Sequence, residues 1–289
     1  MHTRFSKHFG LNTPIALAPM ALASGGALAA ACARAGALGL LGGGYGELSW
    51  LQTQHALAMS LLRGDSSALQ RLGCGFITWK LDEDASALDW LLDQPHTPAA
   101  LMLSFGDPRP YAARIAKRGV PLICQIQRLE QLPVCLEAGA AVIVAQGAEA
   151  GGHGMHSLQA RATFSLVPEL ADALAQHSPS AMLLAAGGIA DGRGLAAARP
   201  RGLAGTSRGR GGLLGLYHNR LAVFLALGLA LPQHLASRAV DEFFGFVGFL
   251  ALQHFPLENF VRKRVPNLLN GNTHIGRQPL EFPPDRMQH

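Results

Sequence analysis

Between Pro14 and Ala198 the sequence alternates between short apolar runs and longer helix-like stretches. The apolar runs are continuous, which is typical of parallel strands covered by helices on both faces. The expected strands are Ile15–Ala18, Leu38–Leu41, Gly75–Trp79, Ala100–Ser104, Pro121–Ile126, Ala141–Ala145 and Met182–Ala186. The expected helices are Ser24–Ala35, Leu48–Leu62, Ala85–Leu92, Pro108–Arg118, Leu129–Ala138, Leu166–Gln176 and Gly192–Ala198. This rhythm restricts the chain to α/β folds with a mainly parallel sheet.

The length of the repeated unit favours a closed barrel. Units of about 20–35 residues, each a strand followed by a helix, are typical of the (β/α)8 TIM barrel. An open doubly wound sheet would carry a G-x-G-x-x-G fingerprint after its first strand. Here Pro19 and Met20 follow that strand, and the glycine-rich run Gly42–Gly46 (GGGYG) does not fit the fingerprint. We therefore expect a TIM barrel.

The eighth strand of this barrel is not evident where it is expected, just after Ala198. The segment Arg199–Gly211 is rich in Arg and Gly and has almost no β-branched residue, which is the composition of a loop. Two apolar runs follow, Leu221–Leu231 and Phe243–Leu252, and we interpret each as a buried helix. Both are shorter than the ~20 residues that span a bilayer. The expected organisation is a barrel body over 1–198 and an atypical segment over 199–289.

The formal net charge of +5 belongs to this last segment alone. Residues 1–198 hold 13 Lys and Arg against 14 Asp and Glu, whereas residues 199–289 hold 11 against 5. Because the barrel body is nearly neutral, we expect neither a nucleic-acid nor a membrane partner.

The compartment is inferred from the beginning of the chain and from the cysteines. An apolar run over Pro14–Ala33 follows basic residues, but Pro14 and Pro19 interrupt it, which argues against a secretory signal. The four cysteines form no C-x-x-C pair, so we expect buried, inert thiols in a reducing compartment. The sequence predicts a cytoplasmic location.

Two glycine-rich loops should lie at the carboxyl ends of neighbouring strands, where TIM barrels build their sites. One is Gln146–Gly154 (QGAEAGGHG), which places His153 at the mouth, and the other is Ala186–Gly194 (AGGIADGRG). Glycines let a flat ligand approach the backbone closely. A Gly-Gly turn at a helix N-terminus attracts phosphate, and the helix dipole contributes ~0.3–2 kcal/mol to the binding of such an anion. Either loop alone is equally consistent with a simple turn, but two such loops on consecutive β/α units indicate a site.

A metal site is not expected. His153 and His156 are three residues apart within a glycine loop, and no third ligand accompanies them.

These segments resemble the nitronate monooxygenase family, formerly called 2-nitropropane dioxygenases. The resemblance covers roughly residues 3–198 in the family's order, and the region after Ala198 is atypical. The matching segments are Pro14–Met20, Gly73–Trp79 (GCGFITW), Leu103–Asp107 (LSFGD), Gln125–Gln127, Val142–Gly154 and Ala185–Leu195. The resemblance implies a (β/α)8 barrel that binds FMN.

The resemblance also implies roles for individual residues. His153 matches the histidine that acts as catalytic base on neutral nitroalkanes. The residues expected at the cofactor are Ala18, Pro19 and Met20 beside the flavin ring, Gln125 and Gln146 at the ring or its ribityl chain, Gly151 and Gly152 close against it, and Ala186, Gly187 and Gly188 at the phosphate.

The implied reaction is the FMN-dependent oxidation of alkyl nitronates, or nitroalkanes, by O2 to a carbonyl compound and nitrite. The partners are then the small-molecule nitronate and O2, with a homodimer as the assembly to test. Flavin-dependent enoyl-ACP reductases and NAD(P)H:quinone reductases resemble this family and remain an alternative. A second alternative is an inactive product with an altered C-terminus, because the family's turn after strand eight is not recognisable and a change of reading frame near Ala198 would explain its loss.

Overall fold

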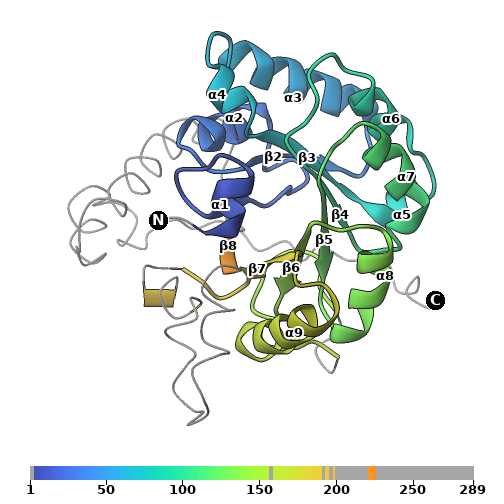
Figure 1. Ribbon diagram of the computed structural model, residues 1–289. Coiled ribbons are helices and arrows are strands. Elements are labelled where there is room, and N and C mark those ends of the chain that lie inside the picture. Colours follow the sequence, from blue (N-terminus) through green and yellow to red (C-terminus); the bar gives the residue numbers. More distant parts are fainter. Residues whose placement is uncertain (1–2, 156–158, 191–192, 195–197, 199–220, 226–289) are drawn as a thin grey trace, which may run out of the picture. The chain divides into compact units, whose positions relative to one another are not determined.

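The chain folds around a closed barrel of parallel strands. The computed structural model describes residues 3–155, 159–190, 193–194, 198 and 221–225. Within them, parallel strands run in the order β1-β8-β7-β6-β5-β4-β3-β2 (Figure 1). Backbone hydrogen bonds from Leu17 to the Leu38 carbonyl (2.8 Å) and from Leu38 to the Ile15 carbonyl (3.0 Å) join β1 to β2. The strands are β1 Ile15–Leu17, β2 Gly39–Gly44, β3 Leu72–Ile77, β4 Leu101–Ser104, β5 Leu122–Ile126, β6 Val142–Gln146, β7 Met182–Ala186 and β8 Leu221–Leu225. The predicted TIM barrel is confirmed.

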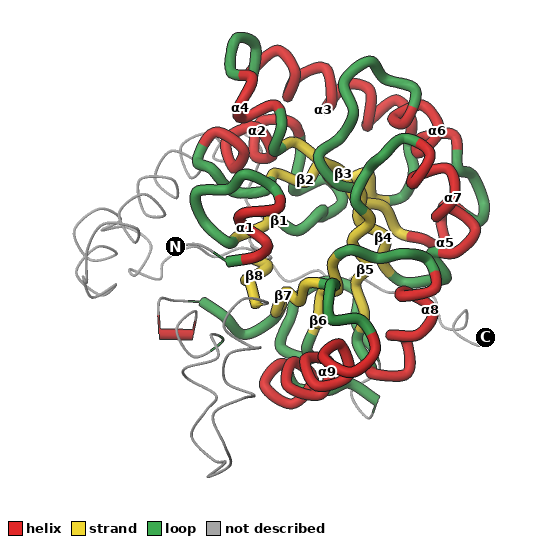
Figure 2. Tube along the Cα trace, in the orientation of Figure 1, coloured by secondary structure: helices red, strands yellow, loops and turns green. Residues whose placement is uncertain are grey.

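Helices surround the strands in the order that the sequence predicts as far as α9 (Figure 2), and the predicted helix Gly192–Ala198 lies largely outside the described residues. The described helices are α1 Arg4–His8, α2 Gly26–Arg34, α3 Leu48–Leu61, α4 Ser66–Leu69, α5 Thr78–Leu81, α6 Ser86–Leu92, α7 Arg109–Lys117, the 3-10 turn η1 Leu129–Gln131, α8 Leu132–Glu137 and α9 Thr163–His177. The short helices α1, α4 and α5 were not predicted. Among the described residues, no helix has both the length and the apolar character needed to cross a membrane.

The strands divide their side chains between two hydrophobic clusters, one inside the barrel and one under the helices. Met102 and Val144 belong to the inner cluster, whereas Leu103 and Ile143 belong to the outer one. Neighbouring residues on a strand point to opposite faces, so a strand that is buried on both faces must be apolar throughout. This explains the continuous apolar runs from which the fold was predicted.

Helix α1 closes the N-terminal end of the barrel. Phe5 is fully buried in the inner cluster, together with Phe9 and Leu11. A capping box begins the helix, because the Thr3 hydroxyl accepts from the Ser6 backbone N–H (3.1 Å) and the Ser6 hydroxyl accepts from the Thr3 N–H (2.9 Å). With this end filled, the opposite end of the barrel is left to carry the site.

The apolar run Leu221–Leu231 was predicted to be a helix, and this prediction is wrong for its first half. Leu221–Leu225 is strand β8, which pairs with β7 at Leu183 and with β1 at Ile15. Without β8, the facing edges of β7 and β1 would lack hydrogen-bond partners, so tertiary pairing decides the conformation. The remainder of that run, Arg199–Gly211 and Phe243–Leu252 lie outside the described residues.

Strands β2 and β3 differ most from their predicted bounds. Strand β2 continues through Gly44, although the sequence ends it at Leu41, and β3 begins at Leu72 and ends before Thr78. A Cβ added to Gly42 would lie 2.2 Å from the Met20 carbonyl oxygen, so only glycine fits there. Glycine is a poor strand former, and this close approach is not visible in the sequence pattern.

The four cysteines are buried free thiols, as predicted. Burial raises the pKa of Cys32 and of Cys74 to about 12, which keeps both as unreactive thiols near neutral pH.

Candidate functional site

The loop after β1 folds down over the carboxyl ends of the strands. The Met20 N–H donates to the Ser24 hydroxyl (2.6 Å), which in turn lies 3.0 Å from the Met20 carbonyl. Pro19 sits over Gly75 of β3, where an added Cβ would be 2.4 Å from the Pro19 Cγ. Ala18, Pro19 and Met20 are thereby held at the mouth of the barrel, and the Gly75 contact requires a glycine.

Three glutamine side chains form a hydrogen-bonded network at the carboxyl ends of β5 and β6. Gln125 and Gln127 both donate through Nε2 to Oε1 of Gln146, and the bond from Gln127 is 2.9 Å long. Gln146 is 7% exposed and donates through its own Nε2 to the His153 carbonyl over 3.1 Å. The structure brings Gln125 and Gln146 together as the sequence suggested, and it adds Gln127. These fixed amides are suited to hydrogen-bonding the polar edge of a planar ligand.

His153 lies beside the aromatic rings of Tyr45 and Phe105, and Trp79 of α5 packs in turn on Tyr45. The Tyr45 hydroxyl oxygen is 3.3 Å from His153 Nε2, and the ring centroids are 6.0 Å apart. The Phe105 ring centroid lies 5.7 Å from that of His153, and Trp79 packs edge-on against Tyr45 at 6.2 Å. The aromatic mouth, as we call Tyr45, Trp79, Phe105 and His153, therefore presents a base within an apolar rim.

Three members of the aromatic mouth were missed in the sequence. Trp79 is the last residue of the family-like segment GCGFITW, Phe105 is the middle residue of LSFGD, and Tyr45 stands inside GGGYG. Their position at or shortly after the end of a predicted strand is the signal that could have identified them, because a barrel places its site there.

Phe105 has a backbone conformation that residues other than glycine rarely adopt. Its φ is +62°, in the left-handed region, which costs on the order of 1–3 kcal/mol. A Cβ added to the next residue, Gly106, would lie 2.7 Å from the Thr78 Cβ, so this turn packs tightly on α5. Backbone strain that persists at the end of a barrel strand is typical of functional sites.

Thr163, the first residue of α9, joins the two glycine loops. Its backbone N–H and its hydroxyl lie 2.8 and 2.9 Å from Glu149 Oε2, and the hydroxyl is also 3.1 Å from the Gly187 carbonyl. A Cβ on Gly147 would lie 2.0 Å from the Thr163 hydroxyl, so that glycine makes room for the junction. The sequence gave no sign of this role for Thr163.

The Glu149 carboxylate is held in its charged form by this junction. Burial alone would raise the pKa of Glu149, but the hydrogen bonds from Thr163 outweigh it and hold the pKa below the ordinary glutamate value. Because an ionised carboxylate accepts hydrogen bonds more strongly than a protonated carboxyl group, the junction is strongest at neutral pH.

The glycines of the two loops leave room for a flat ligand. Gly187 and Gly188 have φ of +111° and +68°, and an added Cβ on Gly187 would lie 2.8 Å from the Ala150 nitrogen. Cβ atoms added to Gly151 and Gly152 would meet nothing within 4 Å. The backbone of Ala186, Gly187 and Gly188 therefore has the small, turned form that suits a phosphate cradle. The turn after β8 lies outside the described residues.

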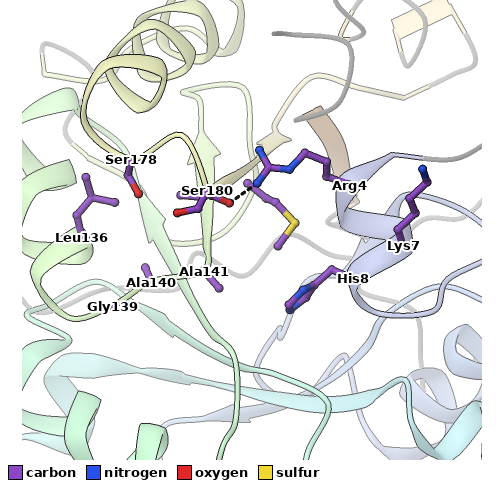
Figure 3. Close-up of a pocket in the computed structure, with 11 residues that line it drawn as sticks. Arg4, Lys7, His8, Leu136, Gly139, Ala140, Ala141, Ser178 and Ser180 are labelled. Carbon is purple, nitrogen blue, oxygen red and sulfur yellow. Dashed lines mark hydrogen bonds between the residues drawn. The ribbon is translucent and has the colours of Figure 1, made fainter.

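The described residues provide no metal site here, and the cavity in Figure 3 lies away from the candidate site. Within the described ranges, no three His, Cys, Asp or Glu side chains are grouped as metal ligands would be, and His156 lies outside those ranges. A cavity of about 590 Å³ opens at the other end of the barrel, between α1 and the loops before β6 and β7. There Arg4 donates to the Pro179 carbonyl (2.9 Å) and also to that of Ser180 (Figure 3). That end of a barrel serves stability, so we assign these contacts to the fold.

Comparison with known proteins gives a family match. The model of the nitronate monooxygenase family matches residues 78–210. A nitronate monooxygenase of Metarhizium robertsii is 37% identical over 214 residues, which are 66% of this chain and 56% of that protein. The Neurospora crassa enzyme of the same name is 32% identical over 225 residues, 68% of this chain and 59% of its own length. The chain thus spans less than two thirds of these two relatives.

Solved structures agree on the architecture. FabK from Thermotoga maritima superposes with a TM-score of 0.59 at 24% identity, covering 78% of this chain and 61% of that one. A nitroalkane oxidase from Streptomyces ansochromogenes gives a TM-score of 0.57 at 23% identity, covering 78% and 67%. At such identities the likeness concerns the fold.

Proposed function

We propose that this chain, in which residues 78–210 match the nitronate monooxygenase family model, oxidises alkyl nitronates and their parent nitroalkanes with O2, using FMN. The products are a carbonyl compound and nitrite. The observation that carries the proposal is the aromatic mouth, where His153 stands beside the Gln125–Gln146 amides and the two glycine loops.

The described residues fit a flavin. The backbone of Ala18, Pro19 and Met20 would lie beside the ring, the glutamine amides would bond its polar edge, and Ala186, Gly187 and Gly188 would receive the phosphate. Gly151 and Gly152 leave open space where a side chain would otherwise stand. When bound, the flavin accepts electrons from the substrate and passes them to O2, and the protein supplies placement and access.

His153 would determine which form of the substrate can react. A neutral nitroalkane is a carbon acid that must lose a proton from the carbon next to the nitro group, and a positioned base speeds such a step ~10²–10⁴-fold. A nitronate has already lost that proton and needs no base. The rim of Tyr45, Trp79 and Phe105 would hold the alkyl part of either form while limiting the access of water.

The proposal also covers the setting of the enzyme. Its partners are a small-molecule nitronate and O2, with no nucleic acid and no membrane, and its location is the cytoplasm. A homodimer is the assembly to test by sedimentation of the purified protein.

Oxygen uptake tests the proposal directly. We expect the purified protein to consume O2 and release nitrite when it receives propionate 3-nitronate or ethyl nitronate, without added NADH. The same preparation is assayed with NADH plus a quinone and with NADH plus an enoyl thioester. NADH oxidation with either acceptor and no nitrite from nitronates would assign the chain to the reductases instead.

A further inference from the structure

We propose that Tyr45 is a positioning residue for His153, whose phenol oxygen holds the Nε2–H so that Nδ1 is the nitrogen that takes the substrate proton. This inference rests on the proposed function. It starts from the contact between Tyr45 Oη and His153 Nε2 at 3.3 Å.

Tyr45 reaches across the mouth because a glycine turn presents it. The Gly46 N–H donates to the Gly43 carbonyl (3.0 Å), and Gly44 and Gly46 on either side of Tyr45 have φ of +50° and +79°. A Cβ added to Gly44 would lie 2.9 Å from the Ala21 side chain, so the turn is packed against the loop after β1. Trp79 supports the Tyr45 ring at an interplanar angle of 65°. A rigid turn with a supported ring is suited to hold another residue in place.

His153 is held from three directions. Tyr45 contacts Nε2 with its ring inclined by 68°, Phe105 packs on the imidazole at an angle of 51°, and Gln146 bonds the His153 carbonyl. The Gln146 and Phe105 contacts fix the backbone and the ring plane. The Tyr45 hydroxyl contacts one ring nitrogen and so distinguishes Nε2 from Nδ1.

The direction of the Tyr45 hydrogen bond follows from what a base requires. A neutral imidazole has one N–H and one lone pair, and the nitrogen that acts as base must keep its lone pair free. Because Nε2 is the nitrogen in contact with Tyr45, the base is Nδ1, and Nε2–H donates to the phenol oxygen. The same bond persists after Nδ1 is protonated, since both nitrogens then carry hydrogen.

The charged side chains near the aromatic mouth are engaged elsewhere. Lys80 pairs with Glu83 at 2.7 Å and lies over the Trp79 ring at 5.1 Å. Glu149 accepts from Thr163. Of the described residues whose side chains contact the His153 ring, Tyr45 is therefore the one that supplies a hydrogen-bonding group.

The step that Tyr45 supports is a simple proton transfer. The C–H bond next to the nitro group breaks, and its electron pair stays on the substrate and delocalises onto the nitro oxygens, giving the nitronate. The proton bonds to Nδ1, so neutral His153 becomes an imidazolium. No electron leaves the substrate in this step, and a preformed nitronate enters the reaction after it.

The test compares two substrates in Tyr45→Phe, which keeps the ring and removes only the hydroxyl. The ratio of kcat/KM for nitroethane to kcat/KM for ethyl nitronate should fall about fivefold to tenfold, the worth of one hydrogen bond. The kinetic isotope effect with nitroethane deuterated at carbon 1 should rise, because C–H cleavage becomes slower relative to the other steps. Tyr111→Phe is the matched control, since it also removes one phenol hydroxyl, in this case one bonded to Asp82 on the outside of the barrel. It should leave the ratio and the isotope effect as they are in the unaltered protein.

Each outcome bears on the proposal. An equal loss on both substrates in Tyr45→Phe would show a structural role and overturn the inference, as would no change in the ratio. An unaltered protein that oxidises ethyl nitronate but not nitroethane would also overturn it, because no base would be at work, while the proposed nitronate oxidation would stand. Failure on both substrates would instead remove the proposed function itself.

Discussion

The two ends of the barrel are built from different kinds of residues. At the N-terminal end, α1 fills the barrel with Phe5 and Phe9, its first turn is capped by Thr3, and Arg4 binds the loop before β7. At the C-terminal end, left-handed glycines, a strained Phe105, three glutamines and an exposed His153 surround an open mouth.

This difference shows that the residues at the N-terminal end stabilise the fold, whereas those at the C-terminal end are arranged for a site. Filling an apolar end with a buried ring stabilises the barrel, whereas the strained backbone at Phe105 lowers its stability. We therefore expect substitutions at the N-terminal end to change unfolding and those at the C-terminal end to change catalysis.

The largest effect should follow from His153→Ala. We expect kcat/KM for nitroethane to fall ~10²–10⁴-fold, because the general base is lost, with a much smaller loss for ethyl nitronate. The melting temperature should change little, since His153 is exposed. Steady-state oxygen uptake with both substrates and thermal unfolding measure the two effects. A fall in melting temperature large enough to account for the lost activity would contradict the assignment of catalysis to the C-terminal end and stability to the N-terminal end.

At the opposite end, Phe5→Ala should cost about 3–5 kcal/mol in the free energy of unfolding, because it leaves a cavity in the inner cluster. Phe164→Ala is the matched control, since Phe164 is 42% exposed on α9, and it should cost well under 1 kcal/mol. Denaturant titration gives both values. The flavin bound per folded molecule of Phe5→Ala should equal that of the unaltered protein, and a selective loss of flavin would contradict the account.

A smaller effect should follow from Thr163→Val, which keeps the side-chain shape and removes the hydroxyl at the junction of the glycine loops. The lost hydrogen bonds should cost about 1–3 kcal/mol, expressed mainly as weaker flavin binding, because both loops line the cofactor site. Thr53→Val is the control, since the Thr53 hydroxyl bonds the Ser49 carbonyl on the exposed face of α3. Fluorescence titration with FMN should separate the two variants, and equal affinities would show that the junction does not shape the site.

The smallest effect should be a dependence on pH through Glu149. Its pKa is lowered in the folded protein, so its stabilisation is present above the ordinary glutamate pKa of about 4.3 and is lost as the pH falls through the lowered folded value. Glu149→Gln should therefore release flavin more readily than the unaltered protein at neutral pH. The gap between them should narrow on acidification, and a gap that is constant down to pH 3 would exclude this role.

The sequence predicted the barrel because its physical cause is local. Strands such as Met182–Ala186 must be apolar throughout when both faces are buried, and that pattern is readable along the chain. Strand β8 was missed because an apolar run such as Leu221–Leu231 has the same composition in a helix as in a strand. Its pairing with β1 and β7 is decided by residues about 200 and 40 positions away.

The candidate site was predictable only in part. His153, Gln146 and the glycine loops stand in sequence motifs, and the structure places them at one end of the barrel. Tyr45 and Thr163 join loops that are distant in sequence, and nothing local to either residue records its partner. Their roles depend on the closure of the barrel, which brings β2, β6 and β7 to a common mouth.

The flavin content of the purified protein tests the central claim most directly. The account predicts a yellow, folded protein that releases close to one FMN per chain on denaturation and loses this cofactor in Thr163→Val before it loses its fold. A folded protein that is colourless and does not bind added FMN would contradict the assignment of the C-terminal end as a flavin site.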